Sequence, residues 1–443
     1  MGESSTCGCS CANLLSDLLD RVAKLESAIG AAGGPLGSGK GEPTQPPQSD
    51  SQAGKVGETA PGPQTVEVPK DVSLSSTKML LQQMCLPRDC DGLGRCFGGI
   101  VLSWIDLAAA YSAVRVAGGP VVTASVDAVY FLRPLTVNTI AVLEATVNCT
   151  FSSSMEVGVR VFEENPSSGE RVETCSAFLT FVSLNSLKRA GNPHPQPLPR
   201  LVAEGAKQEE LMASATRRRQ QRLAKRRAAA AKEPTSLPAT DYRRTISVPD
   251  TSVIRSESRA DPLSRMKISP DRTLSHLVQV VMPQHVNPGG VTFGGQVLSW
   301  VEAAAYLSAV RLNLTGHMLT ANMDAVSFKE STSVGDILYF TSQVTAVFNS
   351  SVEVLVSVFA EQMNGGSNTE EKFVMDAFVT LVSVDDSGKP QPMQVTLDPS
   401  CDMEARRMEE AEQRRAERLE MLKSMLESFS SSPDMKQPAA VRI

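Results

Sequence analysis

Two closely matching stretches of sequence decide the fold of this chain. Residues 97–115 read FGGIVLSWIDLAAAYSAVR, and residues 293–311 read FGGQVLSWVEAAAYLSAVR, 196 positions further along. Each has a Gly-Gly pair after its first Phe and then stays apolar nearly all round, which is typical of a fully buried helix. The sequence therefore predicts one long buried helix in each half of the chain, over about 98–116 and 294–312.

The repetition extends well beyond these two helices. Four further pairs of segments match at offsets of 196 to 200 residues: VTASVDAVYF around Asp127 with LTANMDAVSF around Asp324, FSSSMEVGVRV from Phe151 with FNSSVEVLVSV from Phe348, AFLTFVS from Ala177 with AFVTLVS from Ala377, and RRQQRL from Arg218 with RRAERL from Arg414. The offset changes by only a few residues along the way. The repeated unit is therefore a whole domain with a trailing helix, far too long for the repeats of a solenoid.

Each predicted helix is followed by β-branched, alternating runs that favour strands. We expect strands at Val121–Phe131, Ile140–Cys149, Glu156–Glu163 and Arg171–Ser183, and again at Met318–Phe328, Ile337–Val347, Glu353–Glu361 and Lys372–Ser383. One buried helix enclosed by a run of antiparallel strands is an α+β architecture. A helix too apolar to face water is what a strongly curved sheet would enclose.

Composition divides the rest of the chain into linkers and terminal segments. The predicted organisation is a short helix over 1–30, a disordered Gly, Pro, Ser and Gln-rich linker over 31–74, a first domain with a trailing basic helix over 75–232, a linker over 233–270, a second domain with a trailing charged helix over 271–428, and a disordered tail over 429–443.

The bulk numbers exclude several classes of function. A formal net charge of −6 gives no electrostatic reason to expect nucleic acid as a partner. The nine cysteines form no disulfide framework, which favours a reducing compartment such as the cytoplasm. The four histidines lie far from any metal-ligand spacing, so we expect no metal site. The apolar stretch 97–119 carries Asp106 and Arg115 and recurs with the same polar positions, which favours a buried helix over a membrane span.

The N-terminal thirty residues carry two further patterns. Apolar residues spaced 3-4-3-4 form an a/d heptad seam: Leu15, Leu18, Val22, Leu25 and Ile29. The seam spans only about two heptads, so it predicts either oligomerisation or a helix that packs elsewhere or frays. Gly2 with Thr6 fits a loose myristoylation pattern, and Cys7, Cys9 and Cys11 lie nearby for palmitoylation, although Glu3 opposes it. This leaves open a peripheral membrane contact.

The paired segments closely resemble the tandem hot-dog acyl-CoA thioesterases of the cytosolic acetyl-CoA hydrolase and brown-fat-inducible type. GGIVLSWIDLAA, VTASVDAVYF, FSSSMEVGV, HVNPGGVTFGGQVLSWVE and STSVGDILYFTSQVTAVFNSSVEV carry the resemblance, which runs from Ser75 to Leu426. It implies two hot-dog domains forming an intrachain pseudo-dimer and hydrolysis of acyl-CoA to a free acid and CoA. It also implies no separate cofactor and a cytoplasmic homo-oligomer of three chains. The animal relatives continue into a lipid-transfer domain, and we expect no regulation through one here.

The same resemblance implies a composite site across the two domains. One copy contributes an Asn seven residues before its Gly-Gly, and the other contributes an acid from within its helix. Asn287 with Asp106 makes the intact pair, whereas Asp91 with Glu302 lacks the amide. Two acids would repel each other and raise a pKa, so we expect this second site to be weak or silent.

Each predicted catalytic residue has a structural alternative. Asp106 is expected to act as general base or as direct nucleophile. The structural alternative is a helix carboxylate that is satisfied by a hydrogen bond in the core. Asn287 is expected to orient the attacking water or acid. The structural alternative is that it is simply a turn residue before Pro288. Gly295 is expected to offer its N–H to the developing oxyanion, against a glycine kept for tight packing.

The grip on coenzyme A is also taken from the family. The strand residues Ala124, Ser125 and Val126, the turn residues Ser153, Ser154 and Met155, and Asn322 and Met323 of the second copy are implied to contact it. Arg218 and Arg219 are candidates for its phosphates, although a solvated basic helix explains them as well.

Other classes of protein fit the sequence less well. A hot-dog enoyl-CoA hydratase needs an Asp and a His near the helix. Only the second copy has a histidine close to its helix, His285. A serine hydrolase lacks a suitable Gly-x-Ser-x-Gly and placed histidines. The main alternative is a non-catalytic acyl-CoA sensor or scaffold, which would keep the CoA grip and lose the acid. The presence of Asp106 argues against it.

Overall fold

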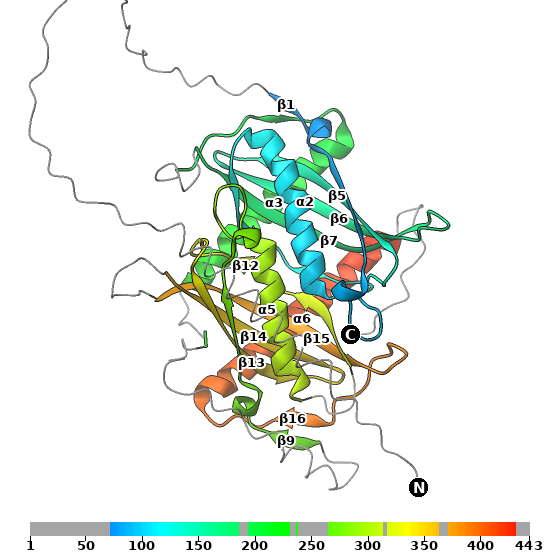
Figure 1. The fold of residues 1–443 in the computed structure, drawn as a ribbon, viewed down its shortest axis with the longest axis vertical. Coiled ribbons are helices and arrows are strands. Elements are labelled where there is room, and N and C mark those ends of the chain that lie inside the picture. Colours follow the sequence, from blue (N-terminus) through cyan, green and yellow to red (C-terminus); the bar gives the residue numbers. More distant parts are fainter. Residues whose placement is uncertain are drawn as a thin grey trace, which may run out of the picture. The chain divides into compact units, whose positions relative to one another are not determined.

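The computed structural model of the chain describes residues 71–185, 194–230, 236–237, 265–312, 317–362 and 371–430. The predicted N-terminal helix, its heptad seam, the lipidation pattern and the C-terminal tail from residue 431 lie outside these residues. Within them, two units of the same design lie together (Figure 1).

The first unit is a curved antiparallel sheet with one long helix against it. Its strands are ordered β3-β7-β6-β5-β2. They span β2 Met79–Met84, β3 Val121–Val126, β5 Ile140–Thr150, β6 Ser154–Glu164 and β7 Arg171–Ser183, with helices α2 Gly98–Ala117 and α3 Ala206–Ala230 and short strands β1 Val72–Ser73 and β8 Leu201–Val202. The predicted helix and antiparallel strands are confirmed. The edge strand β2, which precedes the helix, was not predicted.

The second unit repeats this arrangement, with strands ordered β10-β13-β14-β15-β11. They span β10 Ser275–Val280, β11 His317–Met323, β13 Ile337–Val347, β14 Ser351–Glu361 and β15 Glu371–Val384, with helices α5 Gly294–Val310 and α6 Asp402–Ser430 and short strands β9 Met266–Ile268 and β16 Val395–Leu397. Strand β9 lies inside the predicted linker 233–270, and β1 inside the linker 31–74. Both are drawn into the fold by parallel pairing, β9 with β16 and β1 with β8.

The two sheets exchange their terminal strands. The single strands expected over 121–131 and 318–328 are wrong, because each breaks at an Asp and its second half joins the other sheet. Strand β4 (Val129–Tyr130) pairs with β11, and strand β12 (Val326–Ser327) pairs with β3. At each break the Asp carboxylate binds an arginine of an outer helix, Asp127 with Arg222 and Asp324 with Arg418. The exchange makes two six-stranded sheets, each completed by the other domain.

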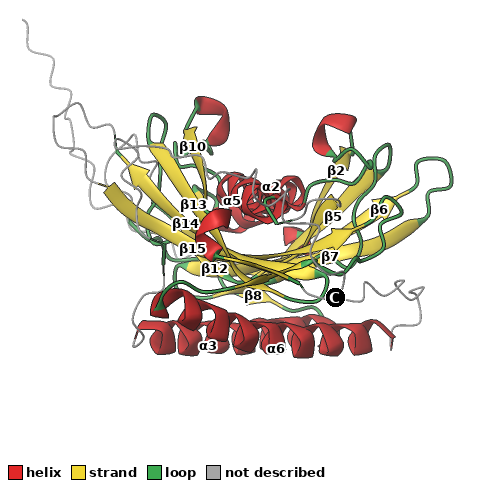
Figure 2. Cartoon of the chain, turned by 90° about the horizontal axis from the view of Figure 1, so that it is seen from below, coloured by secondary structure: helices red, strands yellow, loops and turns green. Residues whose placement is uncertain are grey.

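Helices α2 and α5 pack against each other at very short range, side by side in the concave space of the sheets (Figure 2). A Cβ atom on Gly99 would lie 2.8 Å from the Ser299 Cα, and one on Gly295 would lie 2.8 Å from the Leu102 carbonyl oxygen. Only glycine allows this approach without a shift of backbone. The Gly-Gly pairs therefore set the distance between the helices. This agrees with the structural alternative given above for Gly295, a glycine kept for tight packing.

The helices are not buried on every side, which corrects the sequence-based expectation. Tyr111 and Val114 of α2 and Leu307 of α5 are 41–48% exposed in the single chain. The opposite faces pack against the sheets and form the main core. By length and composition α2 would also suit a membrane span, but 56% of that window is buried inside the chain. One face of the helix pair is therefore not covered by the sheets and exposes these apolar side chains.

The trailing helices α3 and α6 lie across the outer faces of the sheets, opposite α2 and α5 (Figure 2). Each inserts two arginines onto one fully buried glutamate: Arg218 and Arg222 bind Glu156 of β6, and Arg414 and Arg418 bind Glu353 of β14. Burial alone would raise the pKa of Glu353, but the two arginines lower it. The repeated basic segments are therefore part of the internal structure of each domain.

Candidate active site

Asp106 lies at the contact between the two domains and is 1% exposed. Its Oδ2 accepts a hydrogen bond of 2.9 Å from the Gly295 N–H, and its Oδ1 accepts one of 2.8 Å from the Thr123 hydroxyl. Gly295 belongs to the first turn of α5, so the carboxylate of one domain faces the N-terminus of the other domain's helix. Burial raises the pKa of Asp106, and these two hydrogen bonds act against that rise.

Asn287 reaches the same region from the loop before α5. Its Nδ2 donates to the Val121 carbonyl oxygen at 3.3 Å, and its Oδ1 accepts from the Val291 N–H at 3.1 Å. Val121 begins strand β3, which also carries Thr123. Asp106, Asn287 and Gly295 therefore gather around the first residues of β3, with contributions from both domains.

A mirror arrangement surrounds Glu302 of α5, which is 6% exposed. Its Oε2 accepts from the Gly99 N–H at 2.8 Å, and its Oε1 accepts from the Thr320 hydroxyl. Burial raises the pKa of Glu302, opposed by these hydrogen bonds. Asp91 Oδ1 accepts from the backbone N–H groups of Leu93 and Arg95 in its own loop. The second site thus holds its acid as the first does, but has a carboxylate where the first has an amide.

Thr123 and Thr320 were missed by the sequence analysis. Both occur in the repeated pattern Thr-Ala-x-x-Asp, 197 residues apart, so a signal was present. A threonine in a strand is common, however, and its direction depends on the local pleat. Both strands have a register shift directly after the threonine. The pattern alone therefore did not show that these hydroxyls face the helix carboxylates.

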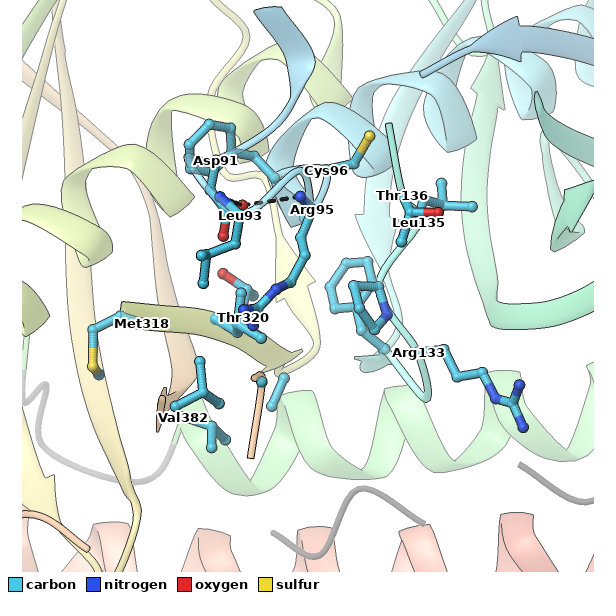
Figure 3. A pocket seen from close by; sticks show the side chains of 18 of the residues that line it. Asp91, Leu93, Arg95, Cys96, Arg133, Leu135, Thr136, Met318, Thr320 and Val382 are labelled. Carbon is cyan, nitrogen blue, oxygen red and sulfur yellow. Dashed lines mark hydrogen bonds between the residues drawn. The ribbon is translucent and has the colours of Figure 1, made fainter. Parts of the chain in front are cut away.

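A cavity of about 560 Å³ lies on the Glu302 side of the domain contact (Figure 3). Glu302, Tyr306 and Thr320 of the second domain line it together with Asp91 and Arg95 of the first. Burial raises the pKa of Tyr306, and the charges of Asp91 and Glu302 add to this rise. The rest of the lining combines apolar residues with the charged side chains of Arg133, Asp386 and Lys389. The apolar residues include Leu93, Val101, Phe131, Leu135, Met318 and Val382. The cavity is large enough for a small organic ligand.

The strand residues expected to contact coenzyme A lie where the two sheets exchange strands. The Ala124 carbonyl oxygen accepts from the Phe328 N–H of the other domain, and Ser125 pairs with Ser327. Asn322 donates to the Val129 carbonyl oxygen. Val126 and Met323 are buried in the core. Their contact with coenzyme A stays a prediction.

The remaining candidates for the CoA grip lie at the start of strand β6 and on helix α3 of the first domain. Ser154 and Met155 begin strand β6 after the turn at Ser153, and Met155 is fully buried. Arg218 binds Glu156 and stacks on Phe178 at 3.7 Å from the ring centroid, so its guanidinium is engaged inside the protein. Arg219 stacks on Phe151 at 4.3 Å. A phosphate contact of either arginine stays a prediction.

The described part of the chain contains no cluster of three His, Cys, Asp or Glu side chains able to hold a metal ion. Its six cysteines are free, and Cys90 and Cys96 lie with their Sγ atoms 3.2 Å apart in the loop before α2.

Comparison with known proteins gives the chain a family. A family model described as the thioesterase superfamily matches twice, at residues 93–170 and 289–367. Acyl-coenzyme A thioesterase 11 of Mus musculus is 31% identical over 78% of this chain and 53% of its own length. The uncharacterized acyl-CoA thioester hydrolase YkhA of Bacillus subtilis is 37% identical over 33% of this chain and 81% of its own length.

One solved structure that the chain resembles is an acyl-CoA hydrolase from Staphylococcus aureus in complex with butyryl coenzyme A, coenzyme A and coenzyme A disulfide. It is 30% identical over 36% of this chain and 94% of that chain, with a TM-score of 0.33. The present chain spans about half the length of the mouse relative. With two matches to the family model and a relative covered over most of its length, the chain belongs to the thioesterase superfamily and carries that family's domain twice.

Proposed function

We propose that the chain is an acyl-CoA hydrolase that converts an acyl-CoA and water into a free carboxylic acid and coenzyme A. The observation that carries this proposal is the contact between Asp106 of one domain and the Gly295 N–H at the start of the other domain's helix. Relatives named as acyl-CoA thioesterases and hydrolases support the substrate class.

In this mechanism Asp106 acts as the general base. It takes a proton from a water molecule as the water oxygen attacks the thioester carbonyl carbon, and the C–S bond then breaks. The proton passes to the leaving thiolate, which restores the carboxylate. A pKa raised by burial makes Asp106 a stronger base than a solvated aspartate. The Asn287 amide lies beside the same strand and orients the water, while the α5 N-terminus favours the negative charge on the carbonyl oxygen.

The test is thiol release from a panel of acyl-CoA esters of increasing chain length. Asp106→Asn keeps the shape and removes the base, so the rate should fall by about two orders of magnitude or more. Asn287→Ala should lose a comparable factor. Glu302→Gln and Asp91→Asn are the matched variants on the mirror side and should lose only a few fold.

Three outcomes of this assay would contradict the proposal. An unchanged rate in Asp106→Asn would remove the mechanism. Equal losses in Asp106→Asn and Glu302→Gln would mean two working sites. Binding of acyl-CoA without any thiol release would make the chain a non-catalytic acyl-CoA sensor.

We also propose that three chains assemble in the cytoplasm. Apolar side chains are exposed on the edge strands: Leu80 and Met84 on β2, and Val278 and Val280 on β10. Together with the uncovered face of α2 and α5, they form surface that a second copy could cover. Two relatives are named cytosolic acyl coenzyme A thioester hydrolases. Light scattering that gives a monomer at micromolar concentration with full activity would contradict the assembly.

A membrane contact through the N-terminus remains a proposal on residues outside the described part, tested by fractionation of the native protein.

A further inference from the structure

The two sites differ at positions that line the cavity. Arg95 pairs with Thr136 as its counterpart Val291 pairs with Ser333, so the two positions are structurally equivalent. The first has a guanidinium and the second an isopropyl group. Likewise Tyr306 of α5 stands where α2 has Ala110, 196 residues earlier. The Glu302 side therefore carries a cation and a phenol that the Asp106 side lacks.

Arg95 is buried, and its guanidinium lacks partners among the residues that the structure describes. The residue is 8% exposed, and its Nη1 atom is fully buried and has no hydrogen-bond partner in this part of the chain. Among the described residues, no carboxylate lies within ion-pair distance of this guanidinium. In Figure 3 the side chain extends from the loop toward Thr320, into the group of residues that line the cavity. A buried cation of this kind is costly unless an anion completes it.

We propose that this cavity binds an amphipathic carboxylate, an unesterified fatty acid, with its carboxylate on Arg95 and its chain along the apolar walls. A planar guanidinium matches a carboxylate through two parallel hydrogen bonds. Tyr306 lines the same cavity, and its hydroxyl group is a third possible donor. Val101, Phe131 and Leu135 supply apolar surface for an aliphatic chain.

The phosphates of coenzyme A fit Arg95 less well than a single carboxylate does. They carry several charges, are strongly hydrated and need several donors. Besides Arg95 the lining contains Arg133 and Lys389, but also Asp91, Glu302 and Asp386, so a group with several negative charges meets more repulsion there than one carboxylate does. The inference concerns binding and does not depend on the proposed hydrolysis. The two can fail separately, because the binding test below contains no thioester.

The test is titration calorimetry of the full chain with dodecanoate as the probe. The chain should bind dodecanoate, and Arg95→Val, which installs the residue of the mirror site, should weaken binding by at least about tenfold. Arg88→Val is the matched control: it removes an arginine from the same segment whose side chain is 80% exposed and outside the cavity. It should bind as the native chain does.

Two further probes separate the chemistry of the ligand. Dodecanol has the alkyl chain without the charge. It should bind to the native protein more weakly than dodecanoate does, and Arg95→Val should bind the two probes equally. Desulfo-coenzyme A has the phosphates without the thiol, and its affinity should not change in Arg95→Val. If Arg95→Val is unfolded by circular dichroism, Arg95→Met, which keeps the aliphatic stem, takes its place. Equal dodecanoate affinity in native chain and variant, or loss of desulfo-coenzyme A binding instead, would overturn the proposal.

Discussion

Gly295→Ala is the change that most directly tests how the helix contact serves the site. A Cβ atom at this position would lie 2.6 Å from the Asp106 Cβ and 2.8 Å from the Leu102 carbonyl oxygen and the Ser103 Cα. Ordinary van der Waals contact begins at 3.4 Å, so α2 and α5 must move apart by about 0.8 Å. The hydrogen bond from the Gly295 N–H to Asp106 would lengthen from 2.9 Å to about 3.7 Å, which is no longer a hydrogen bond.

Two effects on stability oppose each other in Gly295→Ala. Alanine favours the helix by roughly 0.5–1 kcal/mol over glycine, while overpacking of a rigid contact costs about 1–3 kcal/mol. The strained atoms include backbone, which moves less easily than a side-chain end, so a net loss of about 1–2 kcal/mol is expected. Activity should fall by roughly two orders of magnitude, because a displacement of about 1 Å in a catalytic group can cost a factor of about 100.

Thermal denaturation and thiol release measure the two effects, and two other glycines serve as comparisons. Gly119→Ala should change neither quantity, because its nearest foreign atom would be 3.7 Å away. Gly99→Ala introduces equal strain at the Glu302 side, 2.8 Å from the Ser299 Cα. It should cost similar stability but only a few fold in activity. Native activity and stability in Gly295→Ala would refute the argument, and equal activity losses in Gly99→Ala and Gly295→Ala would refute the assignment of one working site.

Three further predictions concern titration, ion pairing and the division of the chain. Burial raises the pKa of Asp106 above the ordinary 3.8, so the unfolded chain loses this proton first and the free energy of unfolding should fall as pH rises above about 4. Urea denaturation at several pH values should show a smaller fall in Asp106→Asn. Arg418→Met leaves the buried Glu353 with Arg414 alone and removes the partner of the partly exposed Asp324, and it should cost about 3 kcal/mol in the same assay. Each domain expressed alone lacks one strand of its sheet and half of the site, so neither should release thiol until the two are mixed.

The sequence predicted those parts of the fold that depend on local pattern. The duplicated Gly-Gly segments predicted α2 and α5 to within two residues, because a long, mainly apolar run without Pro has few alternatives. The strands with clear alternation were predicted with similar accuracy. The edge strands β2 and β10 were missed, since a short polar-apolar run is ambiguous until its partner in the sheet is known.

The parts that failed depend on contacts between the two halves of the chain. No local signal distinguishes a strand that stays in its own sheet from one that crosses to the other after Asp127 or Asp324. The ion pair of Arg218 with Glu156 was not predicted, because Glu156 lies sixty-two residues earlier on a different element. Arg95 drew no attention, because an arginine in a loop is normally solvated. Only its burial in the tertiary structure makes it a candidate anion site.

Fusion of two domains into one chain explains why the two sites differ although the residues that hold their acids are the same. In a symmetric dimer of one domain, a change in one site appears in both. Here each site can change alone, and the residues that hold the two acids are the same on both sides: Thr123 with Thr320, and Gly295 with Gly99. Three residues that line the cavity differ from their counterparts in the other half: Asp91 from Asn287, Arg95 from Val291, and Tyr306 from Ala110. The shared set maintains the close helix contact on which both domains depend, and the divergent set lies where a change alters chemistry without separating the helices. This distribution is what one hydrolytic site and one site for an anion would require.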